Sequence, residues 1–400
     1  MIKNKVVLAF SGGLDTSYCV KYLTKEKGME VHSILVNTGG FDEKELSEIK
    51  ARAFDLGVTS HKCQESTRLF YTSCVKYLIF GNVLRNNTYP LSVSAERVFQ
   101  AMAVAEHTRA LQASYIAHGS TGAGNDQVRF DLIFEIMCPE VKILTPIRDQ
   151  QLSRKQEIDY LQKQGVDWGW TKGQYSINKG LWGTSVGGSE TLTSNLSLPE
   201  EAYPSQLQEK EERHLDLKFV KGEPVGIDDT AFEHPVATIK ALEEIASAYA
   251  IGRDIHVGDT IIGIKGRVGF EAAAALLIIK SHHLIEKHNL TKWQQYWKEQ
   301  LGNWYGMLLH EGQFLDPVMR NIERFLEDTQ QNITGTVHIK LLPYRFELLG
   351  ITSSYDLMSS KFGQYGEMNA GWSGQDVKGF TKILANQNKI FGSINKSSHD

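Results

Sequence analysis

The feature that most constrains this chain is a short apolar run that ends at two adjacent glycines. Residues 5–10 (KVVLAF) have the β-branched and apolar composition of a buried strand. Ser11-Gly12-Gly13-Leu14-Asp15-Thr16-Ser17 follows directly, and residues 16–27 then carry apolar side chains at roughly helical spacing. Paired glycines allow positive φ and leave backbone N–H groups open to a ligand. The order strand, glycine turn, helix therefore predicts an anion-binding loop at the carboxyl end of a strand.

The same alternation continues through the first domain-sized part of the chain. Residues 31–37 and 115–117 have strand-like composition, whereas residues 42–56 and 95–113 have the periodicity of amphipathic helices. Strands and helices that alternate across short connections imply right-handed crossovers and a parallel sheet. We therefore predict an α/β fold with a parallel-sheet nucleotide-binding domain over residues 1–165.

The rest of the chain does not continue the regular alternation of strands and helices. Residues 151–164 predict one more helix, with Ser153 as its N-cap, and residues 165–204 predict a long loop region with little periodicity. Beyond them we expect a hairpin at 218–226, helices at 238–251, 272–288, 293–329, 356–361 and 375–387, and strands at 259–265 and 335–342. These elements predict an α+β synthetase domain over residues 166–355 and a C-terminal helical oligomerisation tail over residues 356–400.

Composition narrows the classes of function. The formal charge of -4 argues against a large basic footprint, so we expect no nucleic-acid partner. No apolar stretch approaches the ~20 residues that a membrane-spanning helix needs. The four cysteines show no CxxC or metal-ligand spacing, which is typical of a reducing compartment. We expect a cytoplasmic protein with no membrane partner.

Asp15 is an unusual residue for a turn that holds only phosphate, because a carboxylate repels one. Ser11, Thr16 and Ser17 supply hydroxyl donors, and the following helix adds the positive end of its dipole. A divalent cation between the carboxylate and the phosphate oxygens explains Asp15, and it indicates Mg²⁺. The loop is neither GxxxxGK[ST] nor GxGxxG. A purely structural glycine turn is the simpler alternative.

A second polar loop lies at residues 119–130 (GSTGAGNDQVRF). Asn125 offers a donor and an acceptor, Asp126 a carboxylate and Arg129 a planar fork. An amino-acid substrate needs such a set, because a fork binds its carboxylate and a carboxylate binds its ammonium group. The alternatives are ordinary turn chemistry and a surface ion pair of Arg129.

Residues 11–17 resemble the pyrophosphate-binding loop of the ATP pyrophosphatases, which hold the β- and γ-phosphates that leave together. Three further segments resemble one group among these enzymes, the argininosuccinate synthase family. Residues 119–130 match its GxTGKGNDQVRF stretch except at the lysine, and residues 89–94 are similar to its YP segment. Residues 175–185 resemble its YSxDxNLW segment, with two serines nine apart. The order and spacing of these motifs fit over residues 6–188.

The resemblance implies an adenine nucleotide α-hydrolase-like fold and a ligase of arginine biosynthesis. The ureido oxygen of citrulline would attack the α-phosphorus of ATP to form citrullyl-AMP and pyrophosphate. The amine of aspartate would then expel AMP and leave argininosuccinate. Asp15, Asp126 and Arg129 would be the catalytic residues, and the sequence identifies no base for the second step. The resemblance also implies Mg²⁺ and a homotetramer with C-terminal helices reaching between subunits.

The roles of the family's residues carry over at the positions that match its motifs. ATP and its departing pyrophosphate would be held by Ala9, Phe10, Ser11, Gly12, Gly13, Leu14, Asp15, Thr16, Ser17 and Gly119. Aspartate would be bound by Thr121, Asn125 and Asp126, the last facing its ammonium group. Citrulline would be bound by Tyr89, Ser94, Asn125, Arg129, Ser176 and Ser185, with Arg129 pairing with its carboxylate.

Four places depart from the family's pattern. Ala123 stands where many members have lysine, and residues 37–40 (NTGG) replace the adenine-side AxIGQ segment. The glutamate and the tyrosine that contact citrulline in the family align with Gly258 and Phe270, so neither position is assigned to the site. Asp259, one position later, is a candidate replacement for the missing carboxylate.

Two other interpretations stay open. One is another adenylating ligase of the same group. A thiolating enzyme needs a catalytic cysteine pair and a basic RNA face, and an amidotransferase needs an N-terminal cysteine or a glutaminase domain, none of which the sequence contains. The other is a non-catalytic nucleotide-binding regulator. Asp15, Asp126 and Arg129 argue against it, because a sensor needs no sites for further substrates.

Overall fold

The computed structural model describes residues 4–170, 175–359, 363, 365–367 and 371–395. The chain divides into two compact units, residues 1–353 and residues 354–400. The division of the larger unit into a nucleotide-binding and a synthetase domain at residue 165 stays a prediction.

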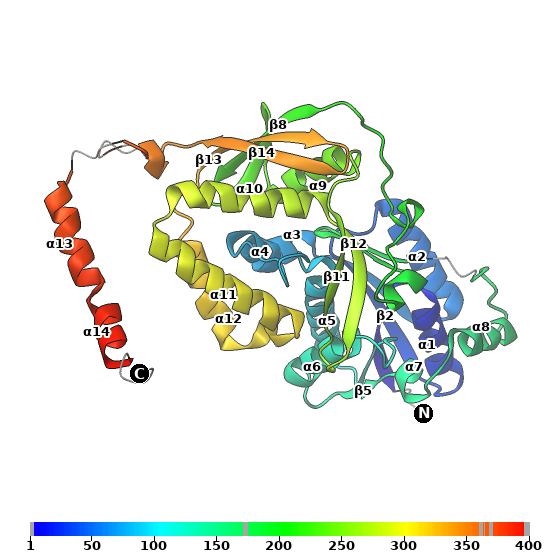
Figure 1. The fold of residues 1–400 in the computed structure, drawn as a ribbon. Helices are drawn as coiled ribbons and strands as arrows, with labels where there is room; N and C mark the ends of the chain where they lie inside the picture. The colour runs from blue at the N-terminus through cyan, green and yellow to red at the C-terminus, as the bar shows by residue number, and fades with distance from the viewer. Residues whose placement is uncertain (1–3, 171–174, 360–362, 364, 368–370, 396–400) are drawn as a thin grey trace. The chain divides into compact units, whose positions relative to one another are not determined.

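A five-stranded parallel sheet forms the first part of the larger unit (Figure 1). Its strands are β1 (Lys5–Ala9), β2 (Glu30–Asn37), β3 (Ser60–Glu65), β4 (Tyr115–Ala117) and β5 (Lys142–Leu144). They lie in the order β3-β2-β1-β4-β5, so the direction of winding reverses between β1 and β4. Parallel α/β sheets bind ligands in the crevice at this point, outside the carboxyl ends of the strands. The predicted fold class is confirmed.

Helices cover both faces of this sheet. They are α1 (Leu14–Lys25), α2 (Glu43–Leu56), α5 (Ser92–Ala110), α6 (Asp126–Met137) and α8 (Arg154–Lys163). Val7 and Ile116 belong to the apolar cluster that contains α5 and α6, whereas Val6 and Leu8 belong to the cluster of α1, α2 and α8. Adjacent residues of a strand point to opposite faces, so a sheet buried on both sides needs an unbroken apolar run.

Short helical turns complete this part of the larger unit. They are α3 (Thr67–Phe70), the π-helical turn η1 (Tyr71–Val75), α4 (Lys76–Phe80) and α7 (Pro146–Asp149). The sequence did not predict β3, β5 or these turns. Such segments are too short for a hydrophobic period to become visible.

Two antiparallel sheets follow within the larger unit. Their strands are β6 (Ser176–Gly180), β7 (Gly183–Gly187), β8 (Arg213–Val220), β9 (Glu223–Ile227), β10 (Thr230–Ala231), β11 (Arg253–Asp259), β12 (Lys265–Glu271), β13 (Gly335–Leu342) and β14 (Arg345–Thr352). One sheet has the order β11-β12-β7-β6, the other β10-β9-β8-β13-β14. The helices are α9 (Pro235–Ser247), α10 (Ala273–Asn289), α11 (Lys292–His310) and α12 (Pro317–Asp328), with short 3-10 turns at η2 (Ser189–Leu192), η3 (Glu200–Ala202) and η4 (Gln313–Leu315). The α+β character expected for this part is confirmed.

Three of the predicted elements are wrong. The loop region expected at 165–204 contains the β6–β7 hairpin, whose polar strand β6 has no apolar period. The strand expected at 259–265 is mainly the turn between β11 and β12. The helix expected at 293–329 is two helices, because Gly312 adopts a φ of +81° and Pro317 starts α12.

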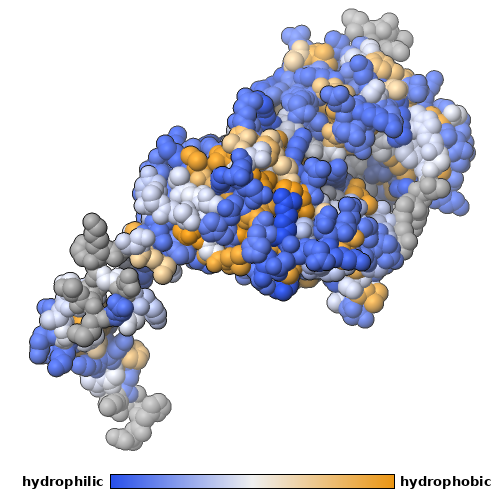
Figure 2. Space-filling model, turned by 90° about the horizontal axis from the view of Figure 1, so that it is seen from above, coloured by the Kyte–Doolittle hydropathy of each residue, from blue (hydrophilic) through white to orange (hydrophobic). Residues whose placement is uncertain are grey.

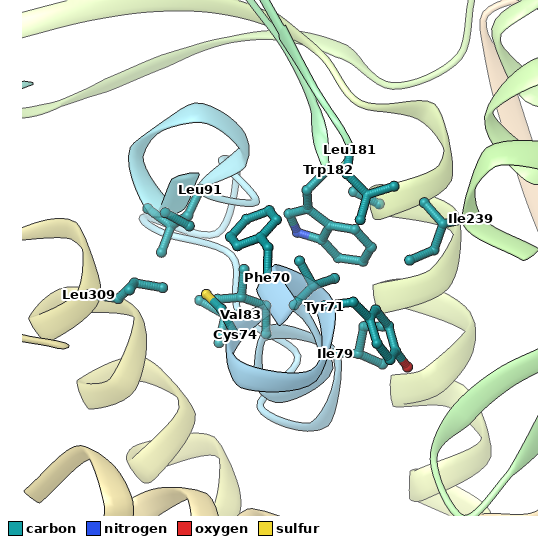
Figure 3. Packing of buried hydrophobic residues seen from close by; sticks show 14 of the residues in the cluster. Phe70, Tyr71, Cys74, Ile79, Val83, Leu91, Leu181, Trp182, Ile239 and Leu309 are labelled. Atoms are coloured by element: carbon teal, nitrogen blue, oxygen red, sulfur yellow. The ribbon is translucent and has the colours of Figure 1, made fainter. Parts of the chain in front are cut away.

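One apolar cluster joins the parallel sheet to the later elements. Trp182, 1% exposed, lies between β6 and β7. Figure 3 shows its indole ring beside Phe70 and Tyr71, with Leu181 and Ile239 of α9 on the other side. Burial of this ring holds the β6–β7 hairpin against the first domain.

The smaller unit consists of short helical segments. They are the 3-10 turn η5 (Leu357–Ser359), α13 (Gly374–Leu384) and α14 (Asn386–Asn395). None of their described residues is buried, although Phe380, Ile383 and Phe391 are large apolar side chains. The helix expected at 375–387 is confirmed. Of the helix expected at 356–361, the described part is a 3-10 turn, and residues 360 and 361 lie outside the described residues.

No helix in the described parts of the chain is both long and apolar enough to cross a bilayer. Seen from above, the surface is mainly hydrophilic, with smaller hydrophobic patches between (Figure 2). All four cysteines are free, and of these Cys63 is exposed.

Trp182 provides a test of the shared core. We expect Trp182→Ala to lower the free energy of unfolding by about 3–5 kcal/mol, because it removes the largest side chain of the cluster and leaves a cavity. Chemical denaturation measures this change. Leu192→Ala, at an 88% exposed position, is the control and should change stability by less than about 0.5 kcal/mol. An equal effect of both substitutions would contradict the role given to Trp182.

Candidate functional site

A cavity of about 1050 Å³ lies at the carboxyl ends of β1, β2 and β4. Residues of the β6–β7 and β11–β12 hairpins also line it, so the later sheet covers the crevice of the first. Nearly all candidate residues from the sequence line this cavity. They are Ala9, Phe10, Ser11, Gly13, Leu14, Asp15, Thr16, Tyr89, Ser94, Gly119, Thr121, Asn125, Asp126, Arg129, Ser176 and Ser185. Gly12 and Ser17 are not among the lining residues.

Gly12 and Ser17 shape the glycine turn. Gly12 has a φ of +75°, and a Cβ there would lie 3.1 Å from Cγ1 of Ile49 on α2. The hydroxyl group of Ser17 is buried and donates to the carbonyl oxygen of Gly13 over 2.8 Å. Gly13 is the N-cap of α1 and receives no side-chain cap, which leaves the first N–H groups of the helix directed at the cavity.

Asp15 lies in the first turn of α1 beside a second carboxyl group. Glu157 of α8 is 2% exposed, and its carboxyl group hydrogen-bonds to Asp15. Burial and, after it, the neighbouring Asp15 together raise the pKa of Glu157 to about 8. At neutral pH, Glu157 therefore carries the proton and donates it to Asp15. The sequence did not predict this pair, because the two residues are far apart in the chain.

The loop after β4 approaches the glycine turn closely. A Cβ on Gly119 would lie 3.3 Å from the carbonyl carbon of Asp15, so only glycine allows this approach without adjustment. His118 links this loop to α6. Its Nδ1 accepts from the Ser120 N–H (3.1 Å), and its Nε2 donates to Asp131 (2.9 Å). The bond from Ser120 selects the neutral tautomer with the proton on Nε2.

Asp126 begins α6 between two arginines. Its Oδ2 accepts from Nε of Arg97 (2.9 Å), and its Oδ1 accepts from Arg129 (3.0 Å). Burial raises the pKa of Asp126, but the two guanidinium groups lower it more, so the pKa lies below its ordinary value. Arg129 is itself buried and donates twice to the main-chain oxygen of His310, over 2.9 and 2.8 Å. A buried, fully oriented guanidinium beside a carboxylate can recognise both ends of an amino acid.

The serines come from two elements that the fold brings together. Asn178 pairs opposite Ser185 in the β6–β7 ladder, and Ser176 lies two residues before Asn178. The three side chains therefore share one face of the hairpin. Ser94 is buried in the first turn of α5, after Leu91 with its φ of +62°.

Tyr89 and Asn125 are fixed by elements distant in sequence. The Tyr89 hydroxyl oxygen accepts from Ser92 Oγ and from the Val93 N–H, both over 3.3 Å. The Oδ1 of Asn125 accepts from the Ile261 N–H (2.8 Å) in the β11–β12 turn. Both candidate citrulline residues are thus held before any ligand arrives.

Asp259, the candidate replacement for the missing carboxylate, lines the cavity but is already paired. Its Oδ1 pairs with Nζ of Lys265 across the β11–β12 hairpin at 2.6 Å, and its side chain is 61% exposed. The side chain beside Gly258 is His256 instead: a Cβ on Gly258 would lie 2.6 Å from its Nε2. Phe270 is fully buried and contacts the ring of Tyr89, with centroids 5.3 Å apart.

The sequence analysis missed several residues of the cavity wall. Arg97 and Glu96 lie in the first turns of α5, directly after the YP segment. Arg97 also donates to Gln100 and Asn178. Glu96 is 2% exposed, and Gly180 allows this, because a Cβ there would overlap the Glu96 carboxylate. Their position beside the YP segment was the available signal.

The whole chain was then compared with known proteins. The model of the "Arginosuccinate synthase N-terminal HUP domain" matches residues 5–167, and that of the "Arginosuccinate synthase C-terminal domain" matches residues 175–391. The chain belongs to the argininosuccinate synthase family. The resemblance drawn from the motifs is confirmed, and the chain is an enzyme of the ligase class.

Similarity to individual members of the argininosuccinate synthase family extends over nearly the whole chain. The argininosuccinate synthase of Methanocaldococcus jannaschii is 36% identical over 364 residues, which cover 90% of this chain and 91% of that protein. The one of Dictyoglomus turgidum is 34% identical and covers 98% of both chains. The one of Xylella fastidiosa is 33% identical and covers 99% of both.

Glu96 makes stability depend on pH. Burial raises the pKa of Glu96 to about 8, although Arg97 lowers it. The folded state then binds more protons than the unfolded state between about pH 4.5 and 8, so this group stabilises the fold at low pH and loses that effect as the pH rises. We expect the melting temperature of Glu96→Gln to fall less than that of the wild type between pH 5 and pH 8.5. Differential scanning calorimetry across this range measures it, and parallel curves for the two proteins would contradict the assignment.

Proposed function

We propose that this protein condenses citrulline with aspartate to form argininosuccinate, with ATP converted to AMP and pyrophosphate through citrullyl-AMP. The observation that carries the proposal is the cavity in which the glycine turn, the Asn125-Asp126 pair and Arg129 meet. One nucleotide-binding loop and a charged amino-acid site in a single cavity suit a reaction with three substrates. The family to which the chain belongs supports the same assignment.

ATP would lie with its β- and γ-phosphates on the glycine turn. Ala9 to Thr16, apart from Gly12, line the cavity there, and Gly119 closes the turn from the other side. The N–H groups at the start of α1 would neutralise the phosphates, and Gly12 and Ser17 would maintain the shape of the turn. The α-phosphorus, where the bond breaks, would then face the sites of the other two substrates.

Mg²⁺ fits this end of the cavity through a single protein carboxylate. The described residues contain no group of three or more His, Cys, Asp or Glu side chains that could hold a metal alone. Mg²⁺ usually takes one or two carboxylates and completes its shell with phosphate oxygens and water. Asp15 would supply that carboxylate, oriented by the hydrogen bond from Glu157. The ion would neutralise charge on the phosphates.

Citrulline would lie between the two sheets. Arg129 would pair with its carboxylate, while Tyr89, Ser94, Asn125, Ser176 and Ser185 would orient the rest of the molecule. The ureido oxygen attacks phosphorus without first losing a proton, so the first step needs positioning and charge neutralisation more than a base. The fixed side chains around Asn125 and Arg129 suit that requirement.

Aspartate would use the carboxylate of Asp126 for its ammonium group, with Thr121 and Asn125 beside it. Arg97 and Arg129 hold Asp126 ionised, so it can accept from an ammonium group at neutral pH. The amine must become uncharged before it attacks the activated ureido carbon. A phosphate oxygen or a substrate oxygen is our candidate for the base.

We also propose a cytoplasmic homotetramer. The helices α13 and α14 bury no described residue within this chain, yet they carry Phe380, Ile383, Leu384 and Phe391 on their surface. A helix with an apolar stripe needs a partner to cover it. Neighbouring subunits would supply this partner.

The identity of the products separates the competing functions. We expect the purified protein to form AMP and pyrophosphate from ATP only when a ureido acid and aspartate are both present. An ion-exchange assay of nucleotides measures this formation. ADP as the product would exclude cleavage at the α-phosphorus, and bound ATP without any turnover would favour the nucleotide-binding regulator.

Asp126 separates the two steps. We expect Asp126→Asn to lower aspartate-dependent AMP release by at least about 100-fold, because the ammonium group loses its charged partner. Citrulline-dependent exchange of pyrophosphate into ATP should persist within about tenfold, since it reports the first step alone. Asp159→Asn, which removes an exposed carboxylate of α8 outside the cavity, is the matched control. Loss of the exchange reaction together with aspartate use would contradict the assignment of Asp126 to the second step.

A further inference from the structure

Among the described residues, the wall of the cavity around Gly258 lacks the unpaired negative charge that the α-amino group of a free amino acid requires. This inference rests on the proposed function, because it concerns the ureido substrate of the same site. Citrulline carries a positively charged α-amino group, and a buried charge needs an opposite charge or several hydrogen bonds. The aligned family position holds a glutamate that contacts citrulline, whereas this chain has Gly258.

Five carboxylates of the described residues line the cavity. Each of them has a hydrogen-bond partner, an ion-pair partner or a buried position that accounts for it. Asp15 and Glu45 lie at the starts of α1 and α2, where Glu45 accepts from the Asp42 N–H. Asp126 lies between Arg97 and Arg129. Glu96 is buried beside Thr38 and Leu181, and Asp259 pairs with Lys265. Of these carboxylates only Asp259 belongs to β11, and its partner on β12 already neutralises it.

His256 takes the space beside Gly258. It is 5% exposed, it lines the cavity, and its Nδ1 has no hydrogen-bond partner in the described structure. Its ring stacks on Tyr89 with centroids 5.2 Å apart, and Phe270 contacts the same tyrosine at 5.3 Å. A side chain at position 258 would collide with Nε2 of His256, so the glycine and the histidine depend on each other.

The surroundings keep this imidazole uncharged. Burial lowers the pKa of His256, and the guanidinium group of Arg85 lowers it further. Burial together with Arg129 lowers the pKa of His310, which also lines the cavity, to about 3. The end of the cavity around Tyr89 therefore presents two neutral imidazoles with Arg85 and Arg129 nearby, and an ammonium group would meet no free negative charge there.

We propose that His256, whose Nδ1 is free of partners among the described residues at the cavity wall near Tyr89, meets the α-nitrogen of a ureido substrate whose carboxylate pairs with Arg129. The site therefore takes a ureido acid without positive charge at its α-carbon, an α-N-acylated citrulline in preference to citrulline. The amide nitrogen of an acylated citrulline is neutral, and its N–H can donate to an imidazole nitrogen. The reaction at the ureido group is the one proposed above, with AMP and pyrophosphate as its other products. Because the acyl group stays on the α-nitrogen, the preferred substrate would give an α-N-acylated argininosuccinate in place of argininosuccinate.

Three ureido acids test this preference in the wild-type enzyme. They are citrulline, α-N-acetylcitrulline, and 5-ureidopentanoate, which lacks the α-nitrogen. With ATP and aspartate saturating at pH 7.5, we expect kcat/KM for AMP formation to be at least about tenfold higher for α-N-acetylcitrulline than for citrulline, because only citrulline must bury an unpaired charge. 5-Ureidopentanoate should also exceed citrulline. A preference for citrulline over both analogues would overturn the inference.

A double substitution tests the role of His256. His256→Ala with Gly258→Glu restores the family's carboxylate and removes the collision, so we expect the order of citrulline and α-N-acetylcitrulline to reverse. Val257→Ala is the control, because Val257 is 54% exposed on the same strand and does not line the cavity. This variant should keep the wild-type preference, with a higher kcat/KM for α-N-acetylcitrulline than for citrulline. An unchanged order in the double variant would overturn the role of His256, and the wild-type comparison stands even if that variant fails to fold.

The same measurement separates this inference from the proposed function. Formation of AMP chiefly from citrulline would overturn the inference and leave the ligase function intact. Formation of AMP from none of the three ureido acids would overturn the proposed function, and the inference with it.

Discussion

Burial of a single apolar cluster across both halves of the larger unit is the constraint on which the site depends. The parallel sheet alone would expose its crevice at the carboxyl ends of β1 and β4 to solvent. Trp182 and Leu181 anchor the β6–β7 hairpin in the cluster that also contains Val7 and Ile116 of the sheet. The polar face of that hairpin is thereby fixed over the crevice. The cavity keeps its shape because apolar residues outside it hold its two walls together.

The two ends of the cavity differ in their charged groups. At the glycine turn the buried carboxyl group of Glu157 hydrogen-bonds to Asp15, and its raised pKa keeps a proton on Glu157 at neutral pH. At the other end Arg97 and Arg129 enclose Asp126 and keep it ionised. A low-dielectric cavity makes both arrangements matter more than they would in water. One end is thus suited to phosphate with a cation and the other to an amino acid.

Two of the four departures from the family's motifs, Gly258 and Phe270, have neighbouring surroundings in space. Gly258 and Phe270 are twelve residues apart, yet their surroundings converge on the ring of Tyr89, which lies against both His256 and Phe270. Gly180 likewise makes room for the buried carboxylate of Glu96. These contacts shape one wall of the cavity, whereas the candidate residues Asp15, Asp126 and Arg129 line it elsewhere.

Local patterns in the sequence determined the glycine turn, the parallel sheet and most of the candidate residues around the cavity. Paired glycines after a buried strand have few other uses, and the GNDQVRF stretch carries its donors and acceptors within one loop. Only the tertiary structure decided that Arg97 joins Asp126 and Glu157 joins Asp15. It also decided that Asp259 pairs with Lys265 and that His256 fills the space beside Gly258. The physical reason is that periodicity and turn chemistry act between neighbours in the chain, whereas burial and charge pairing depend on which distant segments the core brings into contact.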